Sequence, residues 1–281
     1  MQEEERFVRD LMWAVNSPPL MDATHRAAQP LQASDIDGEH LRDHFTRHRD
    51  RRVGRYFERL LAYWVRYIRR CEVVAHSLQL RDGKRTLGEI DLLFRDEQGR
   101  LNHWEVACKF YLQLDVEDGP TRYIGPNPND SLQTKASRLL EHQLPLGLRH
   151  FPEIELQTAF VKGRIFYHWL GDSKGRAPNE LTTDHLKGKW LWARELPELL
   201  GTNPLHYRIL NKPFWLSDEV IDPSGDELLS TDEASRVLGN HFLDRATPIL
   251  ISGFQDGLSL ERECERWFVV PNQWPLEINQ T

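Results

Sequence analysis

The chain has 281 residues, 36 of them basic and 43 acidic, so its formal net charge is −7, and 40% of its residues are hydrophobic. This length is ample for one elaborated core, and no stretch is long and apolar enough to span a membrane. Three widely separated cysteines indicate neither disulfides nor a zinc site. The acidic first residues lack the basic and apolar regions of a signal peptide, so we expect a cytoplasmic protein with no membrane partner.

One segment in the first third of the sequence is basic although the whole chain is acidic. From Leu41 to Arg70, ten arginines face three acids, whereas the segment from Trp215 to Thr281 has a net charge of −9. Such a segment attracts phosphate groups, although a solvated helix face is the alternative interpretation. His40, His44 and His48 are four residues apart, and we interpret them as a surface stripe rather than a zinc site.

A helix is predicted over about Arg51 to Arg70. Its apolar residues recur at helical spacing and its arginines lie on the opposite face. Glu58 lies at the edge of the apolar stripe, where it is either a site acid or a solvated flank residue. The arginines predicted to hold a nucleic-acid backbone are Arg51, Arg52, Arg55 and Arg59. A strand is expected next, from Glu72 to Leu80.

Two alternating runs between Gly88 and Tyr111 predict a β-hairpin that carries chemical residues on one face. In the first run, Asp91 lies opposite to the apolar residues; in the second, His103, Glu105 and Lys109 share one face. A three-residue loop, 97–99, with glycine at its left-handed position sets Asp91 opposite Glu105.

Two carboxylates that face each other across paired strands repel unless a cation lies between them. Mg²⁺ or Mn²⁺ takes oxygen ligands and keeps several waters, so two carboxylates and a substrate phosphate suffice for a site. A nearby lysine then activates water or offsets phosphate charge. The hairpin therefore predicts metal-dependent phosphodiester hydrolysis.

At these residues the chain resembles the PD-(D/E)XK nuclease superfamily, and within it a bacterial branch of unknown function. The resemblance implies that Asp91, Glu105 and the Val106 carbonyl bind the metal, with Glu58 as a further metal ligand. It implies that Lys109 is the catalytic lysine, although Ala107 occupies the position where the superfamily has it. Lys109 still lies on the same face of the strand.

A long connection from Gln113 to Asp130 is rich in Gly, Pro, Asp and Asn and is predicted to be a loop. A helix follows to about Leu144, with Leu132, Leu139 and Gln143 among the residues of its stripe. Lys135 flanks this stripe and either replaces the lysine missing at position 107 or is an exposed helix lysine. A strand from about Ile154 to Phe166 would close the sheet.

The order helix, three strands, helix, strand is that of the superfamily core, so the expected fold is α/β with a restriction-endonuclease-like core. We expect an N-terminal helical segment at 1–50, the core at 51–170 and a mixed C-terminal extension at 171–281. The extension contains a tryptophan-rich mixed region from Lys187 to Trp215, a helix around Asp232 to Leu243, and apolar runs at Pro248 to Phe254 and Phe268 to Pro271.

The sequence thus predicts an Mg²⁺- or Mn²⁺-dependent nuclease that acts on DNA or RNA. The catalytic residues are Asp91, Glu105, Lys109, Lys135 and Glu58. Two alternatives stay open: a catalytically degenerate protein of the same fold that binds nucleic acid or protein, favoured by Ala107 and the acidic net charge, and a phosphoesterase acting on small nucleotides. A homodimer or a protein partner also stays open.

Overall fold

The computed structural model describes residues 2–21, 30–116, 119–171, 178, 181–221, 227–245, 247–255 and 261–275. It is a mixed α/β protein with two compact units, each built from separate stretches of the chain. Unit 1 comprises Met1–Lys109, Gln133–Gly163 and Ala177–Leu186, and unit 2 comprises Phe110–Leu132, Arg164–Arg176 and Lys187–Thr281.

The helices include long amphipathic segments and short turns. The α-helices are α1 (Gln2–Asn16), α2 (Gly38–Thr46), α3 (Val53–Tyr63), α4 (Leu132–Arg138), α5 (Leu144–His150), α6 (Leu196–Thr202) and α7 (Thr231–Asp244). A π-helical turn, η2 (Trp64–Ile68), continues α3, and another, η3 (Leu139–Gln143), joins α4 to α5. Two 3₁₀ turns are η1 (Ala33–Asp35) and η4 (Ala193–Glu195). Within the described ranges, no helix is both long enough and apolar enough to cross a membrane.

The strands are β1 (Glu72–Asp82), β2 (Arg85–Arg95), β3 (Leu101–Leu114), β4 (Arg122–Ile124), β5 (Leu156–His168), β6 (Leu186–Trp192), β7 (His206–Ile209), β8 (Val220–Ile221), β9 (Ile249–Phe254), β10 (Glu261–Arg262) and β11 (Glu265–Val270). Nine of them form a mixed sheet in the order β1-β2-β3-β5-β6-β11-β9-β7, with β4 paired to β3. The β6–β11 pair is parallel, and β8 and β10 pair separately.

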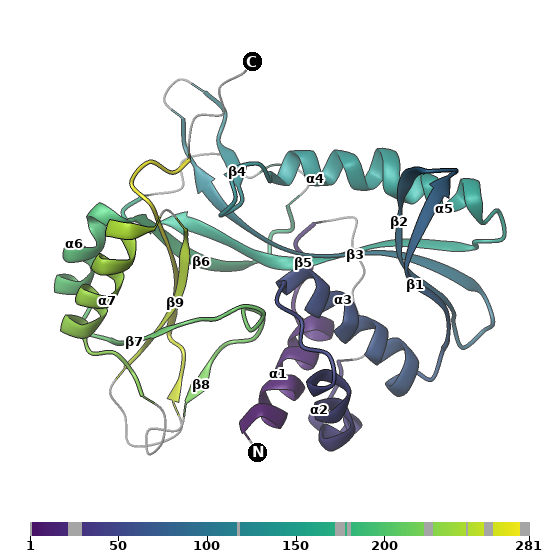
Figure 1. Ribbon diagram of the computed structural model, residues 1–281, viewed down its shortest axis with the longest axis horizontal. Helices are drawn as coiled ribbons and strands as arrows, with labels where there is room; N and C mark the ends of the chain where they lie inside the picture. Colours follow the sequence, from purple (N-terminus) through teal and green to yellow (C-terminus); the bar gives the residue numbers. More distant parts are fainter. Residues whose placement is uncertain are drawn as a thin grey trace. The chain divides into compact units, whose positions relative to one another are not determined.

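In unit 1, helices cover both faces of the strands. Figure 1 shows α1, α2 and α3 on one side of β1, β2, β3 and β5, and α4 and α5 on the other. On the α3 side, the Trp104 ring packs against Trp64 and Phe160, with ring centroids 6.0 and 5.1 Å apart. On the α5 side, Leu146 joins a buried cluster with Leu93 and Leu101. Strand β3 is therefore buried on both faces, which an alternating sequence alone does not predict.

The predicted hairpin is confirmed in its loop and its register. The Asp96 amide donates to the Arg100 carbonyl at 3.0 Å, and Gly99 has a φ of 79°, the left-handed conformation that glycine adopts without strain. Leu92 pairs with Trp104. Loop length and alternation were therefore sufficient to fix how these two strands align.

The order of the other elements also agrees with the prediction. The helix expected at 51–70 is α3 with η2, the next strand is β1, and the helix expected to end near Leu144 continues through α5 to His150. The final strand of the predicted core is β5. The connection from Gln113 to Asp130 is not a loop throughout: β3 runs to Leu114, and β4 pairs with it. Three residues are too few to show an alternating pattern, which is why β4 was missed.

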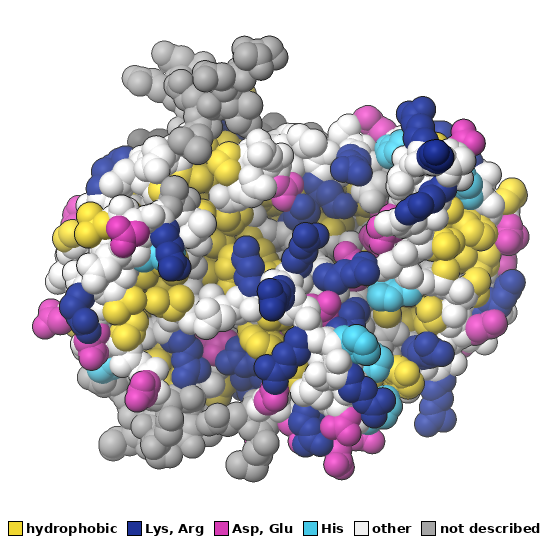
Figure 2. Space-filling view, viewed as in Figure 1, with side chains coloured by type: hydrophobic (Ala, Val, Ile, Leu, Met, Phe, Trp, Pro, Cys, Tyr) yellow, Lys and Arg dark blue, Asp and Glu magenta, His cyan; other side chains and the backbone are white. Residues whose placement is uncertain are grey.

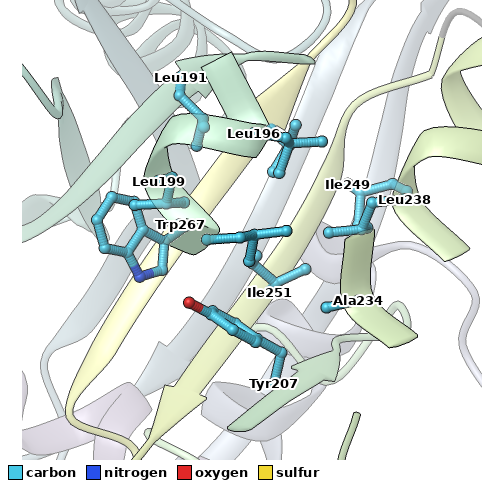
Figure 3. Close-up of a cluster of buried hydrophobic side chains, with 11 residues drawn as sticks. Leu191, Leu196, Leu199, Tyr207, Ala234, Leu238, Ile249, Ile251 and Trp267 are labelled. Carbon is cyan, nitrogen blue, oxygen red and sulfur yellow. The ribbon is translucent and has the colours of Figure 1, made fainter. Parts of the chain in front are cut away.

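Unit 2 has its own core, formed where α6 and α7 pack against β6, β7, β9 and β11 (Figure 3). The predicted C-terminal helix is α7, the two predicted apolar runs are β9 and β11, and the tryptophan-rich region is a mixture of strand and short helix. Ser230 begins α7 with a capping box: its hydroxyl accepts from the Glu233 amide, and the Glu233 carboxylate accepts from the Ser230 amide.

Candidate active site

Asp91 and Glu105 lie side by side where β2 and β3 separate. The β2–β3 ladder ends at the pair Leu92–Trp104, so Asp91 and Glu105 are the next residues in register. In place of a ladder bond, the Val106 amide donates to Oδ2 of Asp91 at 2.8 Å. The amide and carbonyl of one residue in an antiparallel strand point to the same side, so the Val106 carbonyl is directed toward the Asp91 side as well.

The Glu105 side chain is buried and that of Asp91 is partly buried, and the charge of Lys135 only partly offsets theirs. Burial raises the pKa of Asp91 to about 7, and the negative charge of Glu105 adds to this rise. Burial likewise raises the pKa of Glu105 to about 7, against the attraction of Lys135 and a hydrogen bond from Asp91. The pair therefore shares protons near neutral pH and titrates as a unit.

Glu105 is held by a hydrogen-bonded network on the α4–α5 side of the strand. Its side chain has no exposed surface. Nε2 of His103 lies 2.9 Å from Oε1 of Glu105, and Nε2 of Gln143 donates to Oε2 at 2.6 Å. The Nζ of Lys135 in turn donates to Oε1 of Gln143 at 3.2 Å. Each Glu105 oxygen thus has a donor that fixes its position.

His103 is a neutral donor in this network. The Gln157 side-chain amide donates both to the Leu144 carbonyl at 2.6 Å and to Nδ1 of His103 at 3.0 Å, which leaves the ring proton on Nε2, facing Glu105. Burial lowers the pKa of His103 to about 4. Gly147 permits this packing, because a Cβ at its position would lie 2.3 Å from Nδ1 of His103.

Of the two predicted lysines, Lys135 is the one that acts on both carboxylates. Its charge lowers the pKa of both Asp91 and Glu105, and its own pKa is lowered, chiefly by burial and further by Lys109. The sequence candidate on β3, Lys109, lowers the pKa of Lys135 through its positive charge. Its carbonyl is in close contact with Gly163, where a Cβ would lie 1.8 Å from that oxygen.

The predicted third acid also lies near the pair. Burial raises the pKa of Glu58 to about 7, and Asp91 is the next largest cause. Arg55 is 3.6 Å from Glu58 and 3.7 Å from Glu89. Glu58 is thus not a solvated flank residue: it belongs to the same acidic cluster, at its Arg55 edge.

The four arginines predicted to hold nucleic acid have different environments. Arg51, Arg52 and Arg55 are exposed at the start of α3. Arg59 is mostly buried: its guanidinium is 2.5 Å from Asp50 and donates to the carbonyls of His44 and His48. Arg59 therefore stabilises the connection between α2 and α3. Of the four predicted arginines, the other three remain exposed on the surface.

The fit to a metal ion can be judged from the oxygens present. Within the part of the chain that the structure describes, no three His, Cys, Asp or Glu side chains are grouped closely enough to hold a metal ion. Mg²⁺ is commonly bound through one or two carboxylates plus waters and substrate phosphates. Asp91, Glu105 and the Val106 carbonyl match that requirement, and burial raises the pKa of both acids in spite of the opposing charge of Lys135.

Three residues of the site were missed as contributors or given another role by sequence reasoning: Gln143, Gln157 and Gly147. Only Gln143 had a signal, because it is a polar residue on the apolar stripe of its helix. A buried polar side chain at such a position requires a partner, and here the partner is Glu105. His103 was placed on the correct face of its strand, but its full burial was not predicted.

One family model matches a stretch of the chain that includes every residue of the site. Residues 9–270 match a family described as a domain of unknown function, DUF1853. No curated protein and no solved structure matches the chain. The family description carries no activity, and none of these comparisons links the chain to the PD-(D/E)XK superfamily.

Proposed function

The chain belongs to the DUF1853 family, and we propose that it is an Mg²⁺- or Mn²⁺-dependent nuclease with a PD-(D/E)XK-like site in unit 1. One observation carries the proposal: Asp91 and Glu105 adjoin at the point where two strands separate, and the pKa of each is raised to about 7. A pair of acids that destabilises the fold in this way is typical of functional sites.

Asp91, Glu105 and the Val106 carbonyl would hold the metal, with water and a substrate phosphate as its other ligands. When bound, the metal supplies a Lewis acid that lowers the pKa of a coordinated water. Glu58 would act at the edge of this cluster, either as a ligand through water or as a base, because its pKa of about 7 lets it exchange protons near neutrality.

Lys135 is the residue assigned to the lysine role. Burial lowers its pKa and so favours proton exchange, while its position next to both carboxylates puts it beside the reacting phosphate. Gln143 anchors its ammonium group. The lysine would thus come from helix α4 rather than from position 107 of β3, where Ala107 is buried.

His103 and Gln143 are positioning residues for Glu105. They donate to its two oxygens from opposite sides, which fixes the plane of the carboxylate. Because the His103 pKa is lowered to about 4, its ring stays neutral and adds no charge that would repel a metal.

A degenerate binding protein is the second candidate. It is favoured by the complete burial of Glu105 and the use of both its oxygens in hydrogen bonds, which an ionised metal ligand would have to share. In that case the carboxylate pair would have no catalytic role, and nucleic acid or protein would bind to the exposed arginines.

Cleavage of nucleic acid tests the proposal directly. The wild type, Asp91→Asn and Glu105→Gln are incubated with single- and double-stranded DNA and RNA in Mg²⁺ or Mn²⁺. We expect cleavage by the wild type and a loss of about 10³-fold in either variant, since a metal ligand contributes several kcal/mol to the transition state. Asp82→Asn is the matched control, because Asp82 is exposed at the end of β1.

Thermal stabilisation by Mn²⁺ separates the two candidates. A metal that binds only the native state raises the melting temperature, and this rise should vanish in Asp91→Asn but persist in Asp82→Asn. No cleavage together with no Asp91-dependent stabilisation would overturn the nuclease proposal and leave the binding protein.

A further inference from the structure

A cationic pocket lies in unit 1 beside the acidic cluster. It has a volume of about 280 Å³ and is lined by residues of α2, α3, η2 and β1, among them Arg55, Arg59 and Arg66. No carboxylate is among the described residues that line it. Figure 2 shows dark blue and cyan side chains, arginine or lysine and histidine, gathered over the region of α2 and α3.

The pocket has a surplus of positive charge. Arg59 is neutralised by Asp50, whereas Arg55 forms longer ion pairs with Glu58 and Glu89, at 3.6 and 3.7 Å, and donates to Oγ of Ser77 at 2.8 Å. Arg66 is exposed, and within the described ranges no carboxylate pairs with it. A cation at the rim of a recessed surface without an acid partner attracts anions.

The pKa values of the two histidines that line the pocket also indicate a positive potential there. The pKa of His76 is lowered by burial and by the charges of Arg55 and Arg59. The pKa of His44 is lowered by burial and by Arg59, with Arg66 among the further causes. Both rings are therefore neutral near pH 7, so the positive charge of the pocket comes from the arginines.

An exposed aromatic ring lies at the same pocket. Tyr67 on η2 is 41% exposed, an unusual degree for a large ring. The rings of Tyr63 and His40 pack against it, with centroids 4.9 and 4.8 Å away, and the Arg66 guanidinium lies 5.8 Å from its centroid. Exposed aromatic rings next to cations are the elements with which proteins bind unpaired bases of a nucleic-acid strand.

We propose that this pocket binds one nucleotide unit of a single-stranded nucleic acid, with its phosphate on Arg55 and Arg66 and its base against Tyr67. Arg55 connects the pocket to the acidic cluster, because its guanidinium lines the pocket and also faces Glu58 and Glu89. The inference rests on the proposed function in one respect: the bound strand is the substrate of the Asp91–Glu105 site. It adds that this substrate is single-stranded, because a base inside a duplex cannot stack on Tyr67.

The test measures the binding of a short labelled oligonucleotide by fluorescence anisotropy. EDTA is present so that no cleavage occurs. The wild type should bind single-stranded DNA or RNA at least about ten-fold more tightly than the corresponding duplex. Arg66→Gln should reduce the slope of log Kd against log salt by about 1, as expected for the loss of one phosphate contact. Tyr67→Leu should weaken binding about ten-fold with no change in that slope, as expected for lost stacking.

Arg149→Gln is the matched control, because Arg149 is exposed at the end of α5 and does not line the pocket. Circular dichroism and melting temperature establish that each variant is folded. Unchanged binding by both Arg66→Gln and Tyr67→Leu overturns the inference, as does a preference for duplex. Since the assay needs no metal, pocket binding without cleavage would refute only the nuclease, and cleavage with unchanged binding would refute only the pocket.

Discussion

Two buried clusters of charged residues in this protein have opposite character. In unit 2, Arg266 is 2% exposed and donates to both oxygens of Glu263 at 2.5 and 2.6 Å and to the carbonyls of Trp215, Leu216 and Ser217. In unit 1, Asp91 and Glu105 adjoin, and the partly buried Lys135 is a cation that lowers the pKa of both.

The pKa values differ between the two clusters. Burial alone would lower the pKa of Arg266, but the attraction of Glu263 and the hydrogen bonds to it, together with the charges of Asp218 and Glu219, raise it, so the charged form of Arg266 is favoured. The pKa values of Asp91 and Glu105 are displaced to about 7, so their charged forms are disfavoured. A buried ion pair with every donor satisfied is structural, whereas buried acids that repel one another indicate a site that is completed by a ligand.

Breaking the pair in unit 2 should have the largest effect. Arg266→Met leaves the Glu263 carboxylate buried without its partner, and we expect a loss of about 3–5 kcal/mol in the free energy of unfolding, measured with urea. Arg262→Met, an exposed arginine four residues earlier, should change it by less than about 0.5 kcal/mol. A loss below about 1 kcal/mol in Arg266→Met would remove the contrast between the two clusters.

The site lysine gives the next largest effect. Lys135→Met should reduce nuclease activity about 100-fold, because it removes the cation that acts on both carboxylates, whereas Lys109→Met should reduce it less than about ten-fold. Binding of Mn²⁺, measured by thermal shift, should be at least as tight in Lys135→Met as in the wild type, because the variant lacks the positive charge that repels the metal. If Lys109→Met were the more damaged variant, the lysine role would return to β3.

The difference between the two lysines shows where sequence reasoning was sufficient. The facing of Asp91 and Glu105 follows from local features, namely the alternation of the two strands and the glycine in a three-residue loop. The Lys135 contact depends on how α4 and η3 lie against β3, and that is fixed by tertiary packing such as the close approach of Gly147 to His103. Spacing along the chain carries no such information.

Tertiary structure that a sequence pattern does not reveal also explains the other features that were not predicted. The π-helical turn Trp64–Ile68 shifts the face of the helix after Tyr63, so Tyr67 becomes exposed beside Arg66. A pattern at 3.6 residues per turn does not anticipate this shift. The two units are each assembled from separated segments, which hydrophobic periodicity along one segment cannot reveal.

Asp91→Asn should stabilise the metal-free protein, in contrast to Arg266→Met. The folded-state pKa of Asp91, about 7, lies above its unfolded value near 4, so between about pH 4 and 7 the native state holds a proton that the unfolded state has lost. That stabilisation is complete below about pH 4 and is lost as the pH rises through 7. In EDTA at about pH 8 the variant should be on the order of 2 kcal/mol more stable than the wild type, and this difference should shrink below about pH 7 and close near pH 4.

Urea unfolding across this pH range measures the effect of Asp91→Asn. Addition of Mn²⁺ should restore the wild type and leave the variant unchanged, because only the wild type has both carboxylates. Equal stabilities at pH 8 in EDTA would mean that the Asp91–Glu105 pair is already compensated, as the Arg266–Glu263 pair is.

Gln143→Leu should have the smallest effect and gives the finest test of how the acidic pair is held. The change keeps the side-chain size but removes the donor to Oε2 of Glu105 and the anchor of Lys135, so the pKa of Glu105 should rise further. We expect about ten-fold lower activity near neutral pH and an acid limb of the pH–rate profile displaced to higher pH. Gln133→Leu, exposed on α4, is the control. A uniform loss at every pH would mean that Gln143 only supports the packing of its helix, whereas a displaced limb means that it helps to keep Glu105 ionised for metal binding.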